Sequence, residues 1–244
     1  MEASTITSAN GKPVKLKAEH TLTDKKDKSD KVVPIESTKA IVFFVGGAGD
    51  KESYYFSGPY ENIKYAQEPL DERANALQKQ GKYRSAWLGY NQIRGKKDIQ
   101  KNVLNIIPYK SCPIYIIGHS LGGWNSGHLT KTMADWGYTI TTLVTLDPVG
   151  EGTLVWLGSD IAGSAPTPVA EKWINIRATP SKPDDSDKVA DFGERWVMSS
   201  GPDLNVNMDI NHANAFGMFM RPIVGSQSAC DIIFESITNK LAKK

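Results

Sequence analysis

A serine flanked by glycines near the middle of the chain has the spacing of a catalytic nucleophile. Residues 118–123 read Gly-His-Ser-Leu-Gly-Gly and contain Gly-x-Ser-x-Gly, directly after the apolar run 113–117 and directly before a stretch of helical composition. A serine on such a tight strand-to-helix turn exposes its hydroxyl. Glycines on both sides remove side chains that would clash at the turn. We therefore predict that Ser120 is a nucleophile.

A serine nucleophile needs a base, and the chain has four histidines. His119 is next to the serine, and its position in the turn directs it away from the hydroxyl. His128 lies on the same predicted helix, about 12 Å further along its axis, which is too far for a hydrogen bond. His20 lies in a polar segment before the core. His212 follows the last candidate strand, where a loop can reach the carboxyl edge of a sheet, so we predict that His212 is the base.

Asp147 is the first candidate for the acid that orients this histidine. It ends the strand-like run 142–146, which follows the nucleophile strand, and it precedes Pro148. Active sites of open α/β sheets gather at this edge. Four later aspartates stay open as alternatives: Asp184, Asp185, Asp187 and Asp191. No Gly or Glu completes an EF-hand pattern around these four, so we expect a solvated acidic loop there and no metal.

The oxyanion of an acyl-transfer reaction needs two hydrogen-bond donors. One expected donor is the backbone N–H of Leu121, at the start of the helix. The other should come from the loop after an earlier strand, and Val-Gly-Gly-Ala-Gly-Asp at 45–50 follows the first apolar run. We predict the N–H of Ala48, or that of Gly47 if the register differs by one. The glycines and Lys51 also suggest a phosphate loop, but the Gly-x-x-x-x-Gly-Lys-Ser/Thr spacing is absent.

Strands and helices must alternate to position these residues. Apolar and β-branched runs predict strands at 40–45, 83–89, 113–117, 138–146, 173–176 and 195–198. Helical composition lies at 66–80, 97–107, 121–136 and 232–241. The alternation predicts an α/β fold with a mostly parallel sheet covered on both faces. Residues 1–38 read as a polar, charged extension with one edge strand at 13–22, and residues 39–244 as the domain that carries the chemistry.

The glycine-serine turn resembles the nucleophile elbow of the lipase and esterase branch of the α/β hydrolases, and the resemblance covers about residues 39–244. The chain order Ser120, Asp147, His212 is the order of that family. Leu-Asp-Pro at 146–148 is similar to pancreatic-type lipases, which carry the acid directly after the strand that follows the nucleophile strand. Many other members carry it one strand later, which keeps the four later aspartates open. The resemblance implies hydrolysis of a carboxylic ester through an acyl-enzyme, without a cofactor.

Composition narrows the class of protein. The 244 residues carry a net charge of +2, too small an excess to indicate nucleic-acid binding. No run approaches the ~18 apolar residues of a membrane span. Residues 1–12 are polar and lack the apolar region of a signal peptide, so we expect synthesis in the cytoplasm, with export by another route left open. Two cysteines are too few for a disulfide framework, and we expect partly buried thiols.

The apolar stretch 152–170 is the main indication of the substrate. Its charges are limited to Asp160, and it stands where hydrolases insert a cap, so we expect a cap or an acyl-chain pocket, with an ordinary connecting helix as the alternative. Aromatic residues after the oxyanion loop could line the entrance: Tyr54, Tyr55, Phe56 and Tyr60. We expect a lipid or another apolar ester as substrate, with transient contact to a membrane surface.

Two other functions stay open at this point. A compact hydrolase with a charged leader is similar to antibacterial lipase effectors, which cleave phospholipids of rival cells and need an immunity protein and a secretion system. A non-catalytic binding protein on a hydrolase scaffold is the third hypothesis. Residues of all three catalytic types in the expected order argue against it.

Overall fold

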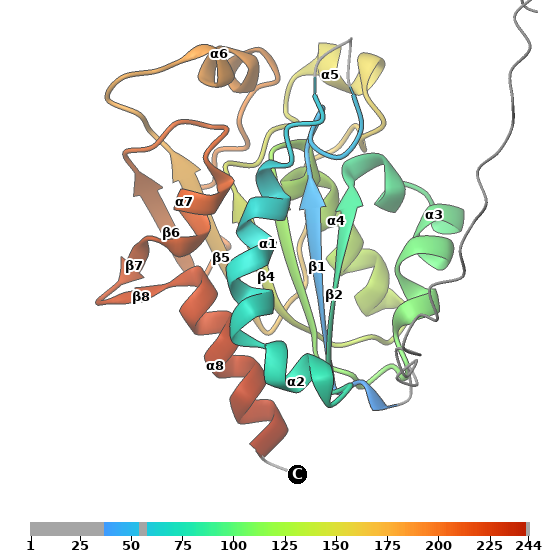
Figure 1. The fold of residues 1–244 in the computed structure, drawn as a ribbon. Coiled ribbons are helices and arrows are strands. Elements are labelled where there is room, and N and C mark those ends of the chain that lie inside the picture. Colours follow the sequence, from blue (N-terminus) through green and yellow to red (C-terminus); the bar gives the residue numbers. More distant parts are fainter. Residues whose placement is uncertain (1–36, 54–57, 243–244) are drawn as a thin grey trace, which may run out of the picture. The chain divides into compact units, whose positions relative to one another are not determined.

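The computed structural model describes residues 37–53 and 58–242. Within them, six strands form one parallel sheet (Figure 1): β1 Ala40–Gly46, β2 Tyr83–Gly89, β3 Ile114–His119, β4 Ile140–Leu146, β5 Lys172–Ala178 and β6 Leu204–Met208. A separate antiparallel hairpin pairs β7 Pro222–Val224 with β8 Gln227–Ser228. Strands β1, β3 and β4 are buried along their whole length, which explains their continuous apolar and β-branched sequences.

The strand order, β2-β1-β3-β4-β5-β6, places the beginning of the fold in the interior of the sheet. The chain runs from β1 outward to β2, then crosses to the other side of β1 to form β3. The order therefore reverses between β1 and β3, and ligands of open α/β sheets bind in the crevice outside such a reversal. The loop after β1 and the turn after β3 meet there, and they carry Gly47 and Ser120.

One face of the sheet is covered by helices from both ends of the fold. They are α1 Asn62–Arg73, α7 Ala215–Met220 and α8 Ala229–Ala242, with the short α2 Asn75–Lys79 after α1. Val42 and Phe44 of β1 point to this face, and the ring of Phe44 meets that of Phe219 edge to face at 5.8 Å. Alternate residues of β1 thus build this core.

The other face is covered by the middle of the chain. Its helices are α3 Lys96–Asn102 and α4 Leu121–Asp135, with the 3₁₀ turns η2 Tyr90–Ile93 and η3 Leu104–Ile106. Trp196 packs in this core between Trp124 at 5.6 Å and Trp173 at 5.4 Å, measured between ring centroids. The remaining helices, α5 Thr153–Gly158 and α6 Asp185–Phe192, lie at the end of the sheet to which its strand arrows point (Figure 1).

The predicted α/β class is confirmed, with helices on both faces of a parallel sheet. The strands expected at 40–45, 83–89, 113–117, 138–146 and 173–176 are β1 to β5, shifted by no more than two residues at either end. Helix 66–80 begins earlier than predicted and is interrupted at Ala74. Helix 97–107 ends early and continues as η3. The predicted edge strand at 13–22, like Tyr54, Tyr55 and Phe56, lies outside the described residues.

The strand predicted at 195–198 is wrong, and the last strand of the sheet is β6. Arg195 makes only an isolated bridge to Val149. The apolar residues of this segment are explained by Trp196, which is buried between two other tryptophans and pairs with no strand. β6, of sequence Leu-Asn-Val-Asn-Met, is a short edge strand with alternating exposure, so its polar residues conceal it in the sequence.

The two cysteines occupy opposite cores. Cys112 belongs to the cluster under α3 and α4, and Cys230 to the cluster under α1 and α8. Both are fully buried, more deeply than predicted. Because the sheet lies between them, they do not pair with each other.

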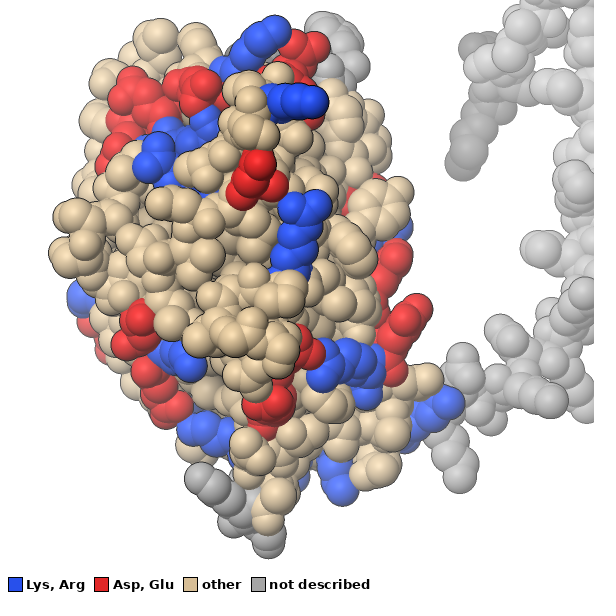
Figure 2. Space-filling model, turned by 90° about the vertical axis from the view of Figure 1, so that its left-hand side faces the viewer, with Lys and Arg blue, Asp and Glu red and all other residues tan. Residues whose placement is uncertain are grey.

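Two properties of the described residues bear on possible partners. None of their helices has the length and apolar character needed to cross a membrane. On the face drawn in Figure 2, basic and acidic side chains are interspersed, with no continuous basic area.

The junction between β1 and α4 gives a direct test of this packing. A Cβ added to Gly122 would lie 2.3 Å from the carbonyl oxygen of Val45 and 2.7 Å from that of Gly46. Both neighbours are backbone atoms, so we expect Gly122→Ala to lower the free energy of unfolding by about 3 kcal/mol. Gly158→Ala is the matched control, since its Cβ would meet no described atom within 4 Å. Urea unfolding of both variants checks this, and equal stabilities would contradict the described contact.

Candidate active site

Ser120 lies on the turn between β3 and α4 in a backbone conformation that few residues adopt. Its φ is 57° and its ψ is −130°, which costs of order 1–3 kcal/mol for a residue with a side chain. The turn is so tight that a Cβ on Gly118 would lie 2.6 Å from the carbonyl oxygen of Gly122. The strained turn exposes the Ser120 side chain to the cleft described below.

A continuous chain of hydrogen bonds joins Ser120, His212 and Asp147. Oγ of Ser120 is 3.0 Å from Nε2 of His212, and Nδ1 of His212 is 2.6 Å from Oδ2 of Asp147. The three residues come from the β3–α4 turn, the loop between β6 and α7, and the position after β4. An ionised carboxylate only accepts hydrogen bonds, so Nδ1 carries the proton and Nε2 is free to accept the serine proton. The structure thus brings together the three side chains predicted for the nucleophile, the acid and the base.

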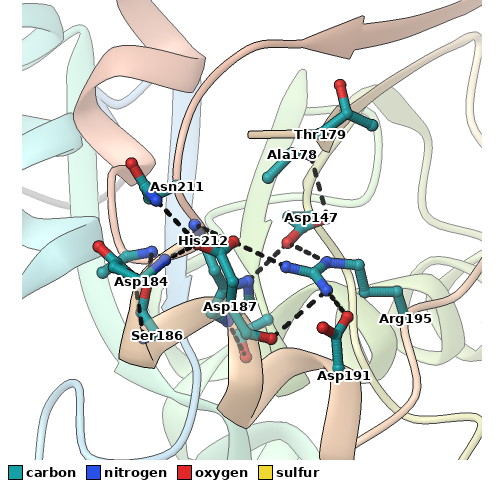
Figure 3. Close-up of polar contacts among 12 residues, drawn as sticks. Asp147, Ala178, Thr179, Asp184, Ser186, Asp187, Asp191, Arg195, Asn211 and His212 are labelled. Carbon is teal, nitrogen blue, oxygen red and sulfur yellow. Dashed lines mark hydrogen bonds and ion pairs between the residues drawn. The ribbon is translucent and has the colours of Figure 1, made fainter. Parts of the chain in front are cut away.

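Asp147 is fully buried and is surrounded by donors (Figure 3). Its Oδ1 accepts the backbone N–H of Ala178 at 3.0 Å, and its Oδ2 accepts both Nδ1 of His212 and Nε of Arg195, the latter at 2.9 Å. Burial alone would raise the pKa of this carboxyl. The hydrogen bond and charge of His212, together with Arg195, outweigh burial and lower the pKa below its usual value. Asp147 therefore stays ionised.

Both backbone polar groups of His212 are held by hydrogen bonds. Its N–H donates to Oδ1 of Asp187 at 3.0 Å, and its carbonyl oxygen accepts Nε2 of His119 at 2.8 Å. The rings of the two histidines lie 4.8 Å apart. Asn211 adds a bond from its side-chain amide to Oδ2 of Asp187, at 2.8 Å. These contacts fix the loop that carries His212, and the bond from its Nδ1 to Asp147 orients the ring.

His119 and His128 make hydrogen bonds to backbone carbonyl oxygens, and neither bonds to Ser120. His119 bonds to a carbonyl oxygen, and burial lowers its pKa to about 3, so it stays neutral beside the serine. Nε2 of His128 lies 2.8 Å from the carbonyl oxygen of Ser164, away from the serine. His20 lies outside the described residues.

The predicted acidic loop is wrong, because residues 185–192 form α6. Asp184 caps this helix by accepting the N–H of Ser186, and Asp187 accepts the N–H of Asp184 in return, at 2.9 Å. This reciprocal pair is a capping box that nucleates a helix among the acidic residues. None of the four alternative acids bonds to the ring of His212. Asp187 and Asp191 bind Arg195 instead.

Sequence reasoning missed the part played by Arg195 and Asp187 in this site. Asp187 is predicted only as an alternative acid, and Arg195 only as part of a strand. The spacing Asp184-x-x-Asp187 is a capping signal that could have indicated α6. No local pattern marks Arg195, whose partners are set by the tertiary fold.

The predicted oxyanion loop lies directly against the serine. A Cβ on Gly47 would lie 2.6 Å from Cβ of Ser120 and 3.0 Å from its Oγ, so only glycine fits there. The N–H of Leu121 opens α4 and has no acceptor within the helix. The N–H of Ala48 donates to no described residue, and Ala48 lines the cleft. The loop that carries Gly47 and Ala48 therefore lies beside Ser120, and the assignment of the three N–H groups as oxyanion donors stays a prediction.

A cleft of about 330 Å³ opens onto these groups. Its walls combine the loop after β1, the elbow, the start of α6 and the histidine loop, and its side chains include Asp50, Tyr60, Val189 and His212. No residue of 152–170 is among the described residues that line it. α6 contributes Asp185, Ser186 and Val189 to this lining, and the cap or acyl-chain pocket at 152–170 stays a prediction.

Within the described residues, no cluster of three His, Cys, Asp or Glu side chains is arranged to hold a metal ion. In comparisons with known proteins, neither a protein-family model nor a curated protein matches the chain.

Asp50, in the loop after β1, gives a pH-dependent test of this site. It is buried, Oδ2 accepts the N–H of Ile63 at 3.3 Å, and Oδ1 has no partner among the described residues. Burial raises its pKa from 3.8 to about 6. A raised carboxyl pKa means that stability is lost as pH rises between these two values, because ionisation is penalised in the folded state.

Asp50→Asn stays neutral at every pH. We expect its Tm, relative to that of the wild type, to rise between pH 4 and pH 7 and to level off above. Asp209→Asn is the control with opposite sign, because the bonds from Ser181 lower the pKa of Asp209. Calorimetry across this range checks both variants, and a pH-independent difference for Asp50→Asn would contradict the buried carboxyl.

Proposed function

We propose that this protein is a serine hydrolase of the α/β-hydrolase type that cleaves carboxylic esters. The observation that carries the proposal is the hydrogen-bond chain Ser120–His212–Asp147, with bonds of 3.0 Å and 2.6 Å, at the floor of a cleft. Nucleophile, base and orienting acid are recognised by such geometry more than by sequence position. The strained serine and the close approach of Gly47 add independent support.

The proposed reaction has two stages. In acylation, Oγ of Ser120 attacks the ester carbonyl while Nε2 of His212 takes its proton, and the same proton passes to the leaving alcohol. In deacylation, His212 removes a proton from a water molecule, and the resulting hydroxide attacks the acyl carbonyl. The bond between the acyl carbon and Oγ of Ser120 then breaks, the carboxylic acid leaves, and His212 returns the proton to Oγ. Asp147 stays ionised throughout and stabilises the imidazolium.

The oxyanion formed in both stages needs donors that are in place beforehand. We assign this part to the N–H of Leu121 and to the N–H of Ala48, with that of Gly47 as the alternative. The loop after β1 and the start of α4 carry these groups at the point where the strand order reverses. Backbone donors there are held by the sheet, so they reorganise little during the reaction.

The surface around the cleft favours an apolar ester, such as a lipid. Val189 and Tyr60 line the cleft and are 66% and 54% exposed. Phe192 on α6 and Leu157 on α5 are also exposed, at the same end of the sheet (Figure 1). Exposed apolar side chains beside a cleft are suited to contact the apolar part of a substrate. Phospholipid cleavage as an antibacterial effector, with an immunity partner, stays a prediction.

The first experiment measures hydrolysis of p-nitrophenyl esters from acetate to palmitate, and of phospholipid vesicles. We expect activity in the wild type and a loss of about 10⁴-fold or more in kcat for Ser120→Ala, since no other group can form the acyl-enzyme. Ser200→Ala is the matched control, because that serine is exposed and lies outside the cleft.

Rates that rise with acyl length would support the apolar ester. Equal activity in the wild type and Ser120→Ala would show that the serine is not the nucleophile. A wild type without activity on any of these esters would favour the binding scaffold.

A further inference from the structure

Arg195 and His212 both contact the predicted acid, and both donate to its Oδ2 (Figure 3). Its side chain is 9% exposed, and its guanidinium binds three carboxylates: Nε donates to Asp147 and Nη2 to Asp187, both at 2.9 Å, and Nη1 donates to Asp191. Its donors are thus directed at carboxylates of this protein. Arg195 is therefore not an anchor for an anionic substrate.

The backbone around Arg195 is also tied to the segment after Asp147. The N–H of Trp196 donates to the carbonyl oxygen of Pro148 at 2.7 Å, and the N–H of Gly150 donates to that of Glu194 at 3.0 Å. Side chain and backbone thus join the same two segments. This double attachment fixes the distance between the guanidinium and the carboxylate of Asp147.

Asp187 extends the contact to the base. Its Oδ1 accepts both Nη2 of Arg195 and the backbone N–H of His212, while its Oδ2 accepts the amide of Asn211 and the N–H of Asp184. The guanidinium therefore touches the acid directly and holds the base through one intervening carboxylate. Arg195 and Asp187 thus link the acid to the base without belonging to the three predicted catalytic residues, and Asp191 adds a further carboxylate on the guanidinium.

The charges around the imidazole of His212 determine whether the ring is neutral or protonated. The ring of His212 contacts Asp147 and His119, and its backbone N–H contacts Asp187. Arg195 binds both of these carboxylates. The other titratable groups that line the same cleft are Asp50, Tyr60 and Asp185. The carboxylates favour the protonated ring, and the cation of Arg195 opposes them. A base must be neutral when the serine attacks. The buried cation therefore offsets the carboxylates that orient the ring.

We propose that Arg195 is a positioning residue of this site, which orients Asp147 directly and His212 through Asp187, and whose charge keeps the imidazole available as a base. This inference rests on the proposed hydrolase function. It predicts that removing Arg195 and removing the charge of Asp187 shift the protonation of the imidazole in opposite directions, which a merely structural ion pair would not do.

The test compares kcat/KM between pH 5 and pH 9.5 for four variants on the best ester of the series. In Arg195→Met we expect the acid limb to move up by about one pH unit, which is about a tenfold loss at pH 6 that recovers above pH 8. In Asp187→Asn we expect the acid limb to move to lower pH, because the positive charge of Arg195 is then neutralised by one carboxylate fewer and disfavours the protonated imidazole. Arg195→Lys keeps the charge and the limb, but lowers kcat at every pH, since an ammonium cannot reproduce the forked contacts.

Arg94→Met is the matched control, because it removes an arginine that pairs with Asp160 outside the cleft. It should leave the profile of the wild type unchanged. If Arg195→Met does not fold, the proposal is still tested by the downward shift expected in Asp187→Asn and by the unchanged limb with lowered kcat expected in Arg195→Lys.

An NMR titration of the four histidines makes the test independent of activity. The resonance of His212 is assigned by its loss in His212→Gln, and its midpoint should move with the acid limb, up in Arg195→Met and down in Asp187→Asn. This readout also separates His212 from Asp50, whose pKa is about 6. Unmoved midpoints, or shifts of the same sign, would overturn the proposal for Arg195. An inactive wild type with opposite shifts would overturn only the proposed function.

Discussion

The arrangement of the second half of the chain depends on the hydrogen bonds that surround the buried carboxylate of Asp147. An ion removed from water costs several kcal/mol unless donors and opposite charge surround it. β5 supplies the N–H of Ala178, the loop after β6 supplies His212, and the segment after α6 supplies Arg195. Segments distant in sequence therefore meet at two oxygen atoms. Because these donors come from successive elements, the site is complete only when β5 and β6 have joined the sheet.

In the first half of the chain, the constraint is the close approach of the loop after β1 to the turn that carries Ser120. The reversal of strand order between β1 and β3 brings the glycine loop against the nucleophile turn, and only glycine at position 47 allows that approach. Among the described residues, the non-glycine residues with positive φ are Glu61, Ser120, Asp147 and Glu194. Each of them belongs to the site or adjoins a residue that does. Backbone strain of this kind persists where surrounding structure fixes it, and it concentrates at functional sites.

Much of the site could be predicted because it follows local rules. Ser120 stands in a turn with a defined sequence, and Asp147 stands at the end of a strand that the sequence shows clearly. Arg195 could not be predicted, since its role depends on contacts 48 residues back to Asp147 and 8 residues back to Asp187. β6 could not be predicted because polar residues alternate along this edge strand. The strand predicted at 195–198 is wrong because its apolar residues serve to pack Trp196 against two other tryptophans. Local patterns thus indicate the elements, whereas charge compensation is decided by the fold.

The most direct test of the central claim is the site at which a fluorophosphonate probe forms a covalent adduct. The probe phosphonylates a serine only when a neighbouring base activates the hydroxyl, so the arrangement of Ser120 and His212 predicts one adduct per chain. Peptide mass spectrometry of the labelled full chain should locate it on Ser120, and unfolding in urea before labelling should abolish it. A folded protein that remains unlabelled, or that carries the adduct on another serine, would contradict the account.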